Sequence, residues 1–324
     1  MRLLSFLLGF ACAAASAPSP AYRLRVEYLD SPLTVDVTTP RFSWALAHAD
    51  RAQYQTAYHL TVATVGGATV WDTGVVTSNT SLNIPYGGTA LQSDTDYLWT
   101  LAWTDAAGTT APPATATFST GLLSPAAWNG AEYVSSTANG SLNTYRAEFT
   151  LAALPARARL FIVGLVRTVT LPPYLPSRGA RNSAAPPPPS PSLPASQGYY
   201  KALFNGELTD DHERGIFPTF EQRVLYDVVD VTPRLRVGCN ALGVMLGHGW
   251  FSQPKVHSGP RQFMMLLSLT DAAGAVTYLH SASAAAPGAL TFTATAGPVQ
   301  LDDVRCRLPA ARRRSLAPAR CLLP

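Results

Sequence analysis

Residues 198–251 read GYYKALFNGELTDDHERGIFPTFEQRVLYDVVDVTPRLRVGCNALGVMLGHGWF, and this stretch decides the fold class. Asn205-Gly206 lies between two short apolar runs, and an Asn-Gly pair in that position is the strongest short-range signal for a β-hairpin. The polar segment 209–215 separates this hairpin from two further β-like runs, at residues 223–232 and 240–250. The stretch therefore predicts short antiparallel strands joined by tight turns.

The regions on either side continue the same pattern. Downstream, residues 261–283 contain a Thr-Asp-Ala-Ala-Gly turn between two apolar runs, and residues 290–301 form a last β-like run. Upstream, residues 144–151 and 158–165 are short β-like runs as well. Together these runs predict one sandwich over residues 121–303, of the jelly-roll-like kind.

Residues 18–120 predict a separate sandwich. Apolar and polar residues alternate over 22–29, 57–64 and 95–104, with clusters of Gly, Pro, Asn and Asp between the runs. This spacing is typical of immunoglobulin-like and fibronectin type III-like modules. The fold class is therefore all-β, with two consecutive antiparallel β-sandwiches.

Three tryptophans of the first sandwich have two interpretations. Trp44, Trp99 and Trp103 stand in or beside the alternating runs, so we expect them in the core. A platform of exposed aromatic rings that stacks against sugars is the alternative.

Residues 166–197 interrupt the second sandwich. They contain four consecutive prolines at 186–189 and no apolar periodicity, so the segment can neither donate ladder hydrogen bonds nor bury much surface. We expect a disordered or polyproline-like excursion. Residues 304–324 also lack a β pattern and are expected to form a disordered tail outside the second domain.

The N-terminus has the features of a secretory signal peptide. Arg2 precedes an apolar run over residues 3–15, and the small residues Ala15-Ser16-Ala17 follow. We expect a signal peptide over residues 1–17, cleavage near Ala17 and a secreted, extracellular protein, with an uncleaved membrane anchor as the alternative. No other run approaches the roughly 20 apolar residues of a transmembrane helix, so no membrane span is expected.

Charge and cysteine content argue against several classes of protein. Only 14% of the 324 residues are charged and the formal net charge is +4, which does not indicate a nucleic-acid partner. Cys12 lies in the leader, and Cys306 and Cys321 lie in the tail, which leaves Cys239 alone in the folded region. No disulfide framework is therefore expected, and Cys239 is interpreted as a small packed side chain.

Several phrases resemble the N-terminal region of bacterial-type α-L-rhamnosidases, a family of glycoside hydrolases. They are LRVEYLDSPLTVDVTTPRFSWAL (24–46), TDYLWTLAWTDAAG (95–108), GYYKALFNGELTDD (198–211) and NALGVMLGHGWF (240–251). The resemblance covers residues 22–303 apart from the proline-rich segment. It implies an immunoglobulin-like domain, then a jelly-roll domain that helps to recognise substrate, with rhamnose-containing glycans or glycosides as partners.

The resemblance also implies that the chemistry of such enzymes lies in an α/α barrel, with two acidic residues as general acid and general base of an inverting hydrolysis. No part of the sequence matches the barrel or its acidic motif, so no catalytic residue is assigned and the chain alone is expected to be inactive. Asp210, Asp211 and Glu213 form the densest acidic cluster. Adjacent loop carboxylates lack the buried, differing surroundings that a catalytic pair needs.

The candidate binding residues lie around the hairpin. Asn205, Asp210 and Asp211 offer oxygen ligands of the kind that calcium prefers, and the resemblance implies a jelly-roll domain that in some members binds rhamnose with calcium. A plain turn and a solvated loop are the alternatives. Trp250 is expected either to pack or to stack against a sugar. No other metal or cofactor is expected.

Two boundaries suggest a faulty gene model. Family members run directly from an apolar strand into Gly-Tyr-Tyr, so residues 166–197 look inserted, and the codons of Val166 and Gln197 can carry the usual intron ends. A second such boundary at Val304 would explain the tail and the missing barrel. The hypothesis is thus the N-terminal part of a secreted α-L-rhamnosidase-like enzyme. The alternatives are a stand-alone secreted carbohydrate-binding β-sandwich protein and, more weakly, an adhesion protein.

Overall fold

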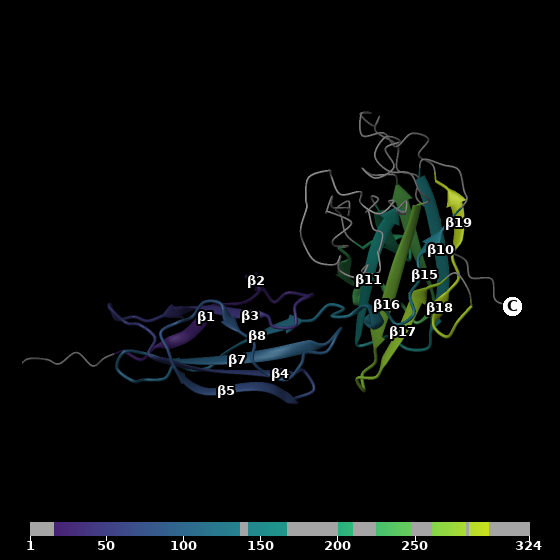
Figure 1. Ribbon diagram of the computed structural model, residues 1–324. Helices are drawn as coiled ribbons and strands as arrows, with labels where there is room; N and C mark the ends of the chain where they lie inside the picture. Colours follow the sequence, from purple (N-terminus) through teal and green to yellow (C-terminus); the bar gives the residue numbers. More distant parts are fainter. Residues whose placement is uncertain are drawn as a thin grey trace, which may run out of the picture. The chain divides into compact units, whose positions relative to one another are not determined.

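The structure is a computed structural model, which describes residues 16–136, 142–166, 200–209, 225–247, 261–282 and 285–297. The chain divides into two compact units, Met1–Ala127 and Trp128–Pro324. Strands build both units (Figure 1), and all the described strand pairs except the short parallel pair β17 (Val276–Ser281) and β18 (Ala289–Leu290) are antiparallel, which confirms the all-β class. Within the described ranges the only helical elements are two 3-10 turns, η1 (Pro125–Trp128) and η2 (Thr232–Arg234), and no helix is long and apolar enough to cross a membrane.

The first unit is a sandwich of two four-stranded sheets. One sheet has the order β2-β1-β3-β6, with strands β1 (Ser19–Val26), β2 (Leu29–Asp30), β3 (Arg41–Ala47) and β6 (Ile84–Pro85). The other has the order β5-β4-β7-β8, with strands β4 (Ala57–Thr64), β5 (Thr69–Thr77), β7 (Asp96–Thr104) and β8 (Ala114–Ser119). Three of these strands, β1, β4 and β7, contain the alternating runs from which the sandwich is predicted.

Tryptophan side chains form the centre of the first core. Trp44, Trp99 and Trp103 are at most 2% exposed, because alternate side chains of a strand point to the same face of its sheet. The ring nitrogen of Trp44 donates to Gln55 Oε1 (2.9 Å), and that of Trp103 donates to the Ser19 carbonyl oxygen (2.9 Å). The prediction of core tryptophans is confirmed, and the alternative of an exposed aromatic platform is wrong.

The second unit is a larger sandwich. Its five-stranded sheet has the order β13-β12-β15-β10-β19, with strands β10 (Leu142–Leu151), β12 (Tyr200–Phe204), β13 (Glu207–Leu208), β15 (Gly238–Gly247) and β19 (Thr293–Ala296). The facing sheet has the order β14-β11-β16-β17-β18, with strands β11 (Arg157–Val166), β14 (Asp227–Asp230), β16 (Arg261–Thr270), β17 (Val276–Ser281) and β18 (Ala289–Leu290). Strand β9 (Val134–Ser135) pairs with β16.

Apolar side chains from both sheets meet in one core. Tyr145 of β10 and Phe204 of β12 come from the first sheet, and Leu160 of β11 and Phe263 of β16 come from the second. All four are fully buried, and the rings of Tyr145 and Phe263 lie 4.9 Å apart edge to face. This core joins residues on both sides of the proline-rich segment, so the two halves of the domain fold as one unit.

The strands that flank residues 166–197 lie in different sheets. Strand β11 pairs with β14 and β16, whereas β12 pairs with β13 and β15. The two strands nevertheless meet across the core, because the Tyr200 hydroxyl lies 3.4 Å from the Ile162 carbonyl oxygen and donates to the Asp227 carboxylate. Val166, the first residue of the predicted insertion, ends β11 and pairs with Arg261, so the strand extends one residue into that segment. The predictions for residues 167–197 and for the tail fall on residues outside the described ranges, as does the apolar leader over residues 3–15.

Cys239 differs from the sequence-based expectation. It is disulfide-bonded, and its partner lies outside the described residues, since Cys239 is the only cysteine among them. The interpretation as an unpaired, packed side chain is therefore wrong. The sequence-based interpretation placed the other three cysteines in the leader and the tail. Residue spacing alone does not show which cysteines pair.

Candidate functional site

The Asn-Gly hairpin forms where it is predicted. Strands β12 and β13 are joined by Asn205 and Gly206, whose φ angles are +52° and +90°. Two consecutive positive φ angles define the tight hairpin turn that favours Asn followed by Gly, because both residues tolerate left-handed backbone. The Asn205 amide also donates to the Ala241 carbonyl oxygen (2.8 Å), which attaches the turn to β15.

The Asn205 side chain is engaged within the protein. Its Nδ2 donates to the Arg234 carbonyl oxygen (2.8 Å) and to Asn240 Oδ1 (3.0 Å), and its Oδ1 accepts from the Ala241 amide (3.0 Å). Both donor hydrogens and one acceptor position of the carboxamide are thereby used. The structure gives Asn205 a structural role, and its predicted contact with a ligand stays a prediction.

Asn240, a hydrogen-bond partner of Asn205, was not identified as a candidate from the sequence. It is fully buried, and its Nδ2 donates to the carbonyl oxygens of Arg236 (2.7 Å) and Gly238 (3.0 Å), while its Oδ1 accepts from the Arg236 amide (3.0 Å). The sequence signal for Asn240 was a polar residue near the start of the otherwise apolar strand β15. With Asn205 it fixes the hairpin to the loop that precedes β15.

The predicted acidic residues follow directly on this hairpin. Thr209, the last described residue there, is buried and bonds to the Ala202 carbonyl oxygen through its amide (2.9 Å) and its hydroxyl (3.1 Å). Asp210, Asp211 and Trp250 lie outside the described residues. Of the four predicted binding residues, the structure therefore places Asn205 alone and does not bring the set together.

Strand direction nevertheless relates the segments that carry these residues. Strands β13 and β15 both pair antiparallel with β12 and lie on either side of it, so they run in the same direction. Tyr200 pairs with Leu246 near the end of β15, and Thr209 continues beside β12 as far as Ala202. The chain therefore leaves β13 and β15 towards the same end of the sheet.

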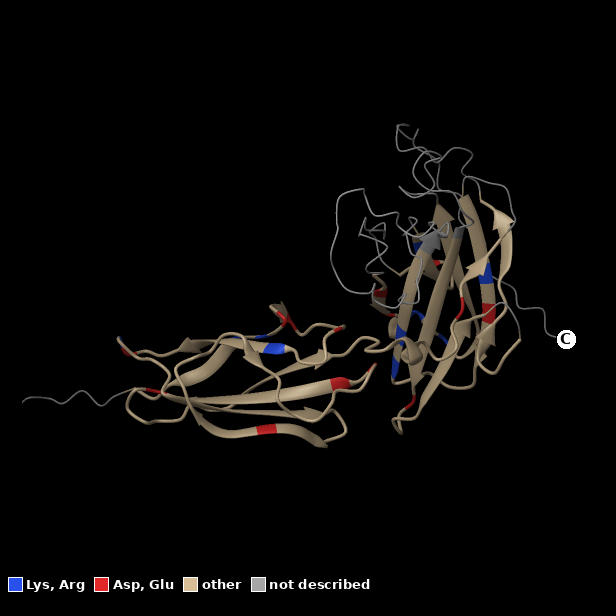
Figure 2. Ribbon diagram, in the orientation of Figure 1, with Lys and Arg blue, Asp and Glu red and all other residues tan. Residues whose placement is uncertain are grey.

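The described residues contain no preformed metal centre. Among them there is no group of three or more His, Cys, Asp or Glu side chains that could hold a metal ion. Charged residues are few and dispersed over both units (Figure 2). The Asn205 oxygen already accepts a backbone hydrogen bond, so calcium stays a prediction that depends on Asp210 and Asp211.

An aromatic cluster on the outer face of β11 was not predicted. Trp128, Tyr133 and Tyr226 pack around Val163 and are all partly buried. The rings of Trp128 and Tyr226 lie 5.5 Å apart at 77°, and burial raises the pKa of Tyr133 to about 12. The sequence signal was two aromatic residues, Trp128 and Tyr133, ahead of the first β-like run of the second sandwich. Packing on Val163 accounts for their arrangement.

Two family models match the chain. The model "Rha78A-like, N-terminal immunoglobulin domain" matches residues 21–124, and the model "Alpha-L-rhamnosidase N-terminal domain" matches residues 194–283. The first match lies within the first unit, and the second contains the hairpin, β14, β15, β16 and β17.

Two proteins of similar sequence are α-L-rhamnosidases. An α-L-rhamnosidase of Formosa agariphila is 26% identical over 235 residues, which are 69% of this chain and 23% of that protein. An α-L-rhamnosidase of Streptomyces avermitilis is 35% identical over 118 residues, which are 35% of this chain and 11% of that protein. The chain thus spans less than a quarter of either relative.

A solved structure shares the fold. The α-L-rhamnosidase from Dictyoglumus thermophilum matches with a TM-score of 0.68 at 24% identity, over 89% of this chain and 31% of that chain. At this level of identity the likeness shows the arrangement of the strands and not the activity.

Proposed function

We propose that this chain, which carries the N-terminal immunoglobulin domain and the N-terminal domain of α-L-rhamnosidases, is the substrate-recognition part of a secreted rhamnosidase. Its ligand would be the rhamnose unit of a glycan or glycoside. The observation that carries the proposal is the succession of these two domains along one chain.

The geometry of the hairpin supports binding at one end of the second sandwich. Asn205 and Asn240 fix the turn, and Thr209 fixes the point from which the acidic segment leaves. A rigid anchor lowers the entropy lost when a binding loop is ordered by its ligand. Asp210 and Asp211 follow Thr209 directly, and position 250 follows the end of β15 by three residues. Strands β13 and β15 run in the same direction, so both lead towards the end of the sheet after which the proposed binding residues follow in the sequence.

Calorimetric titration of the full chain with L-rhamnose, with and without calcium, tests the proposal. We expect saturable binding that the double substitution Asp210→Asn and Asp211→Asn weakens about tenfold or more, as loss of a charge-assisted contact of about 1.4 kcal/mol would do. Calcium dependence that disappears in the same variant would assign the ion to these carboxylates.

Glu207→Gln is the matched control, because Glu207 is an exposed carboxylate of the same hairpin on the other side of Thr209. It should bind rhamnose as the unaltered chain does. Absence of rhamnose binding both with and without calcium, or an equal loss in both variants, would overturn the assignment of the recognition site to this loop.

A further inference from the structure

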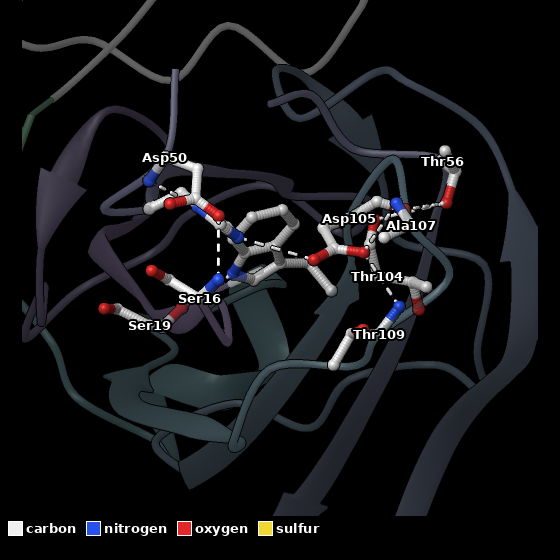
Figure 3. A network of polar contacts seen from close by, with 10 residues as sticks. Ser16, Ser19, Asp50, Thr56, Thr104, Asp105, Ala107 and Thr109 are labelled. Atoms are coloured by element: carbon white, nitrogen blue, oxygen red, sulfur yellow. Dashed lines mark hydrogen bonds and ion pairs between the residues drawn. The ribbon is translucent and has the colours of Figure 1, made fainter. Parts of the chain in front are cut away.

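The first described residues of the chain are built into the first unit. The Ser16 backbone N–H donates to Asp50 Oδ2 at 2.8 Å, and Pro18 is buried. Ser19 begins β1, pairs with Ala47 of β3, and accepts a hydrogen bond from Trp103 at its carbonyl oxygen. Figure 3 shows Ser16 and Ser19 in this polar network. The first domain thus includes Ser16 in its hydrogen-bond network, although the mature chain is expected to begin two residues later, near Pro18.

Three Ala-x-Ala triplets in the sequence satisfy the small-residue rule for removal of an export segment. Ala11-Cys12-Ala13 would place the cut before Ala14, Ala13-Ala14-Ala15 before Ser16, and Ala15-Ser16-Ala17 before Pro18. The sequence alone does not distinguish these sites. The products of successive sites differ by two residues, and they differ in the location of the new positive charge.

Cleavage before Pro18 conflicts with the structure in two ways. It removes Ser16 and with it the hydrogen bond to Asp50. It also places the charged amino group on Pro18 and not on Ser16, the residue whose nitrogen contacts the Asp50 carboxylate.

Cleavage before Ser16 fits the structure best, because cleavage before Ala14 keeps the Ser16 hydrogen bond but places the new positive charge two residues away from it. The nitrogen that becomes the new α-ammonium group is the atom already 2.8 Å from the Asp50 carboxylate. That separation lies in the range of charge-assisted N–H···O hydrogen bonds. Hydrogen bonds from Ser16 hold the pKa of Asp50 below its ordinary value. The carboxylate is therefore in its charged form at neutral pH.

We propose that the export segment is removed between Ala15 and Ser16, and that the freed α-amino group of Ser16 forms an ion pair with Asp50. Asp50 in turn connects the new terminus to the interior of the domain. Its amide donates to His48 Nδ1 (2.9 Å), and His48 Nε2 lies 3.4 Å from Asp105 Oδ2 in a buried position. Because Nδ1 accepts, the ring proton of neutral His48 is on Nε2 and faces Asp105.

The inference depends on export, which is part of the proposed function. Expression of the full chain in a secreting host, followed by N-terminal sequencing of protein from the medium, tests the cleavage. The expected sequence is Ser-Ala-Pro-Ser. A secreted protein that begins at Ala14 or at Pro18 would overturn this inference and leave export intact. A protein retained in the cell with its leader would overturn both.

Labelling of the terminal amine tests the ion pair. Only the unprotonated amine reacts with an amine-directed ester, so a paired ammonium group should label about two- to fivefold more slowly, as expected for a partly exposed ion pair. Asp50→Asn should remove this protection. The chain has only two lysines, Lys201 and Lys255, which serve as internal references for the reagent.

Asp72→Asn is the matched control, because Asp72 is an exposed carboxylate of β5 whose partner is His59. It should leave the labelling rate of Ser16 unchanged. Equal labelling rates in the unaltered protein and in Asp50→Asn would contradict the ion pair.

Discussion

The same five residues, Thr-Asp-Ala-Ala-Gly, close a turn in each unit, at 104–108 and at 270–274. The turns have the same hydrogen bonds. Asp105 Oδ1 accepts from the amides of Ala107 (2.9 Å) and Thr109 (2.8 Å), and Asp271 Oδ1 accepts from Ala273 (2.8 Å) and Ala275 (2.9 Å). Their surroundings differ, because Asp105 is 1% exposed whereas Asp271 lies on the surface.

The comparison separates what the local sequence determines from what the rest of the chain adds. The carboxylate that accepts from the amides two and four residues ahead is a local property, so it recurs wherever the pentapeptide occurs. Burial of Asp105 comes from residues far away in the sequence. Thr56 Oγ1 donates to its carbonyl oxygen (2.8 Å), and His48 Nε2 lies 3.4 Å from its carboxylate.

The largest expected difference between the turns concerns the carboxylates themselves. Asp105→Ala removes a carboxylate that is 1% exposed, accepts from two amides and faces His48, so it should lower the free energy of unfolding of the first unit by about 3 kcal/mol. Asp271→Ala leaves amides that water can reach, and about 1 kcal/mol is expected in the second unit. Scanning calorimetry with separate transitions for the two units measures both. Equal losses would mean that burial adds nothing to this turn.

Continuity of the chain is a second expected difference between the units, because the sequence predicts a long interruption in the second unit and none in the first. Deletion of residues 166–197 should keep that unit folded and raise its free energy of unfolding by up to about 2 kcal/mol, since a shorter loop costs less entropy to close. Three Cα steps from Leu165 to Tyr200 reach about 10 Å, which matches the usual spacing of about 10 Å between packed sheets. Calorimetry of the second transition measures the change.

The contact of Tyr200 with Ile162 shows that the two strand ends lie opposite each other. Loss of the cooperative transition of the second unit on deletion would contradict the interpretation of 166–197 as an insertion. Deletion of a stretch of equal length that removes β10 should abolish that transition and is the control.

The contact of His48 with Asp105 is one of the long-range contacts that distinguish the first turn from the second. A double-mutant cycle of His48→Ala and Asp105→Asn should show a coupling free energy of about 1 kcal/mol, because the two side chains are buried and in contact. The same cycle with Asp271→Asn should be additive, since Asp271 belongs to the other unit. Denaturant unfolding of the four variants of each cycle provides the values. Additive effects in both cycles would show that His48 does not contribute to the stability of the turn around Asp105.

The turns and contacts compared above also show how much of the structure the sequence could predict. Alternation, turn residues and the Asn-Gly pair are local signals, so the all-β class, the core tryptophans and the hairpin were accessible. The bond between Asn205 and Asn240 joins residues 35 positions apart, and the contact between His48 and Asp105 is similarly remote. No local pattern contains such partners. The disulfide of Cys239 was missed for the same reason.

The candidate site was predicted less completely than the fold. Asn205 was identified as a turn residue and as a candidate ligand, and its carboxamide proves to be used in fixing the turn. An Asn in a turn has the same sequence signature whether its amide faces a ligand or the backbone. Asp210, Asp211 and Trp250 stay predictions, which the rhamnose titrations can decide.

The smallest expected difference concerns the glycines that end the two turns. Gly108 has φ +82° and Gly274 has φ +85°, and a Cβ added at either would meet no atom within 4 Å. Replacement by Ala therefore costs only the strain of a left-handed backbone, about 1 kcal/mol at each site. The calorimetric losses of Gly108→Ala and Gly274→Ala should agree closely, although the neighbouring aspartates differ in burial. A much larger loss at Gly108 would show that the buried network around Asp105 also restrains the backbone of its turn, and the local and environmental contributions would no longer be separable.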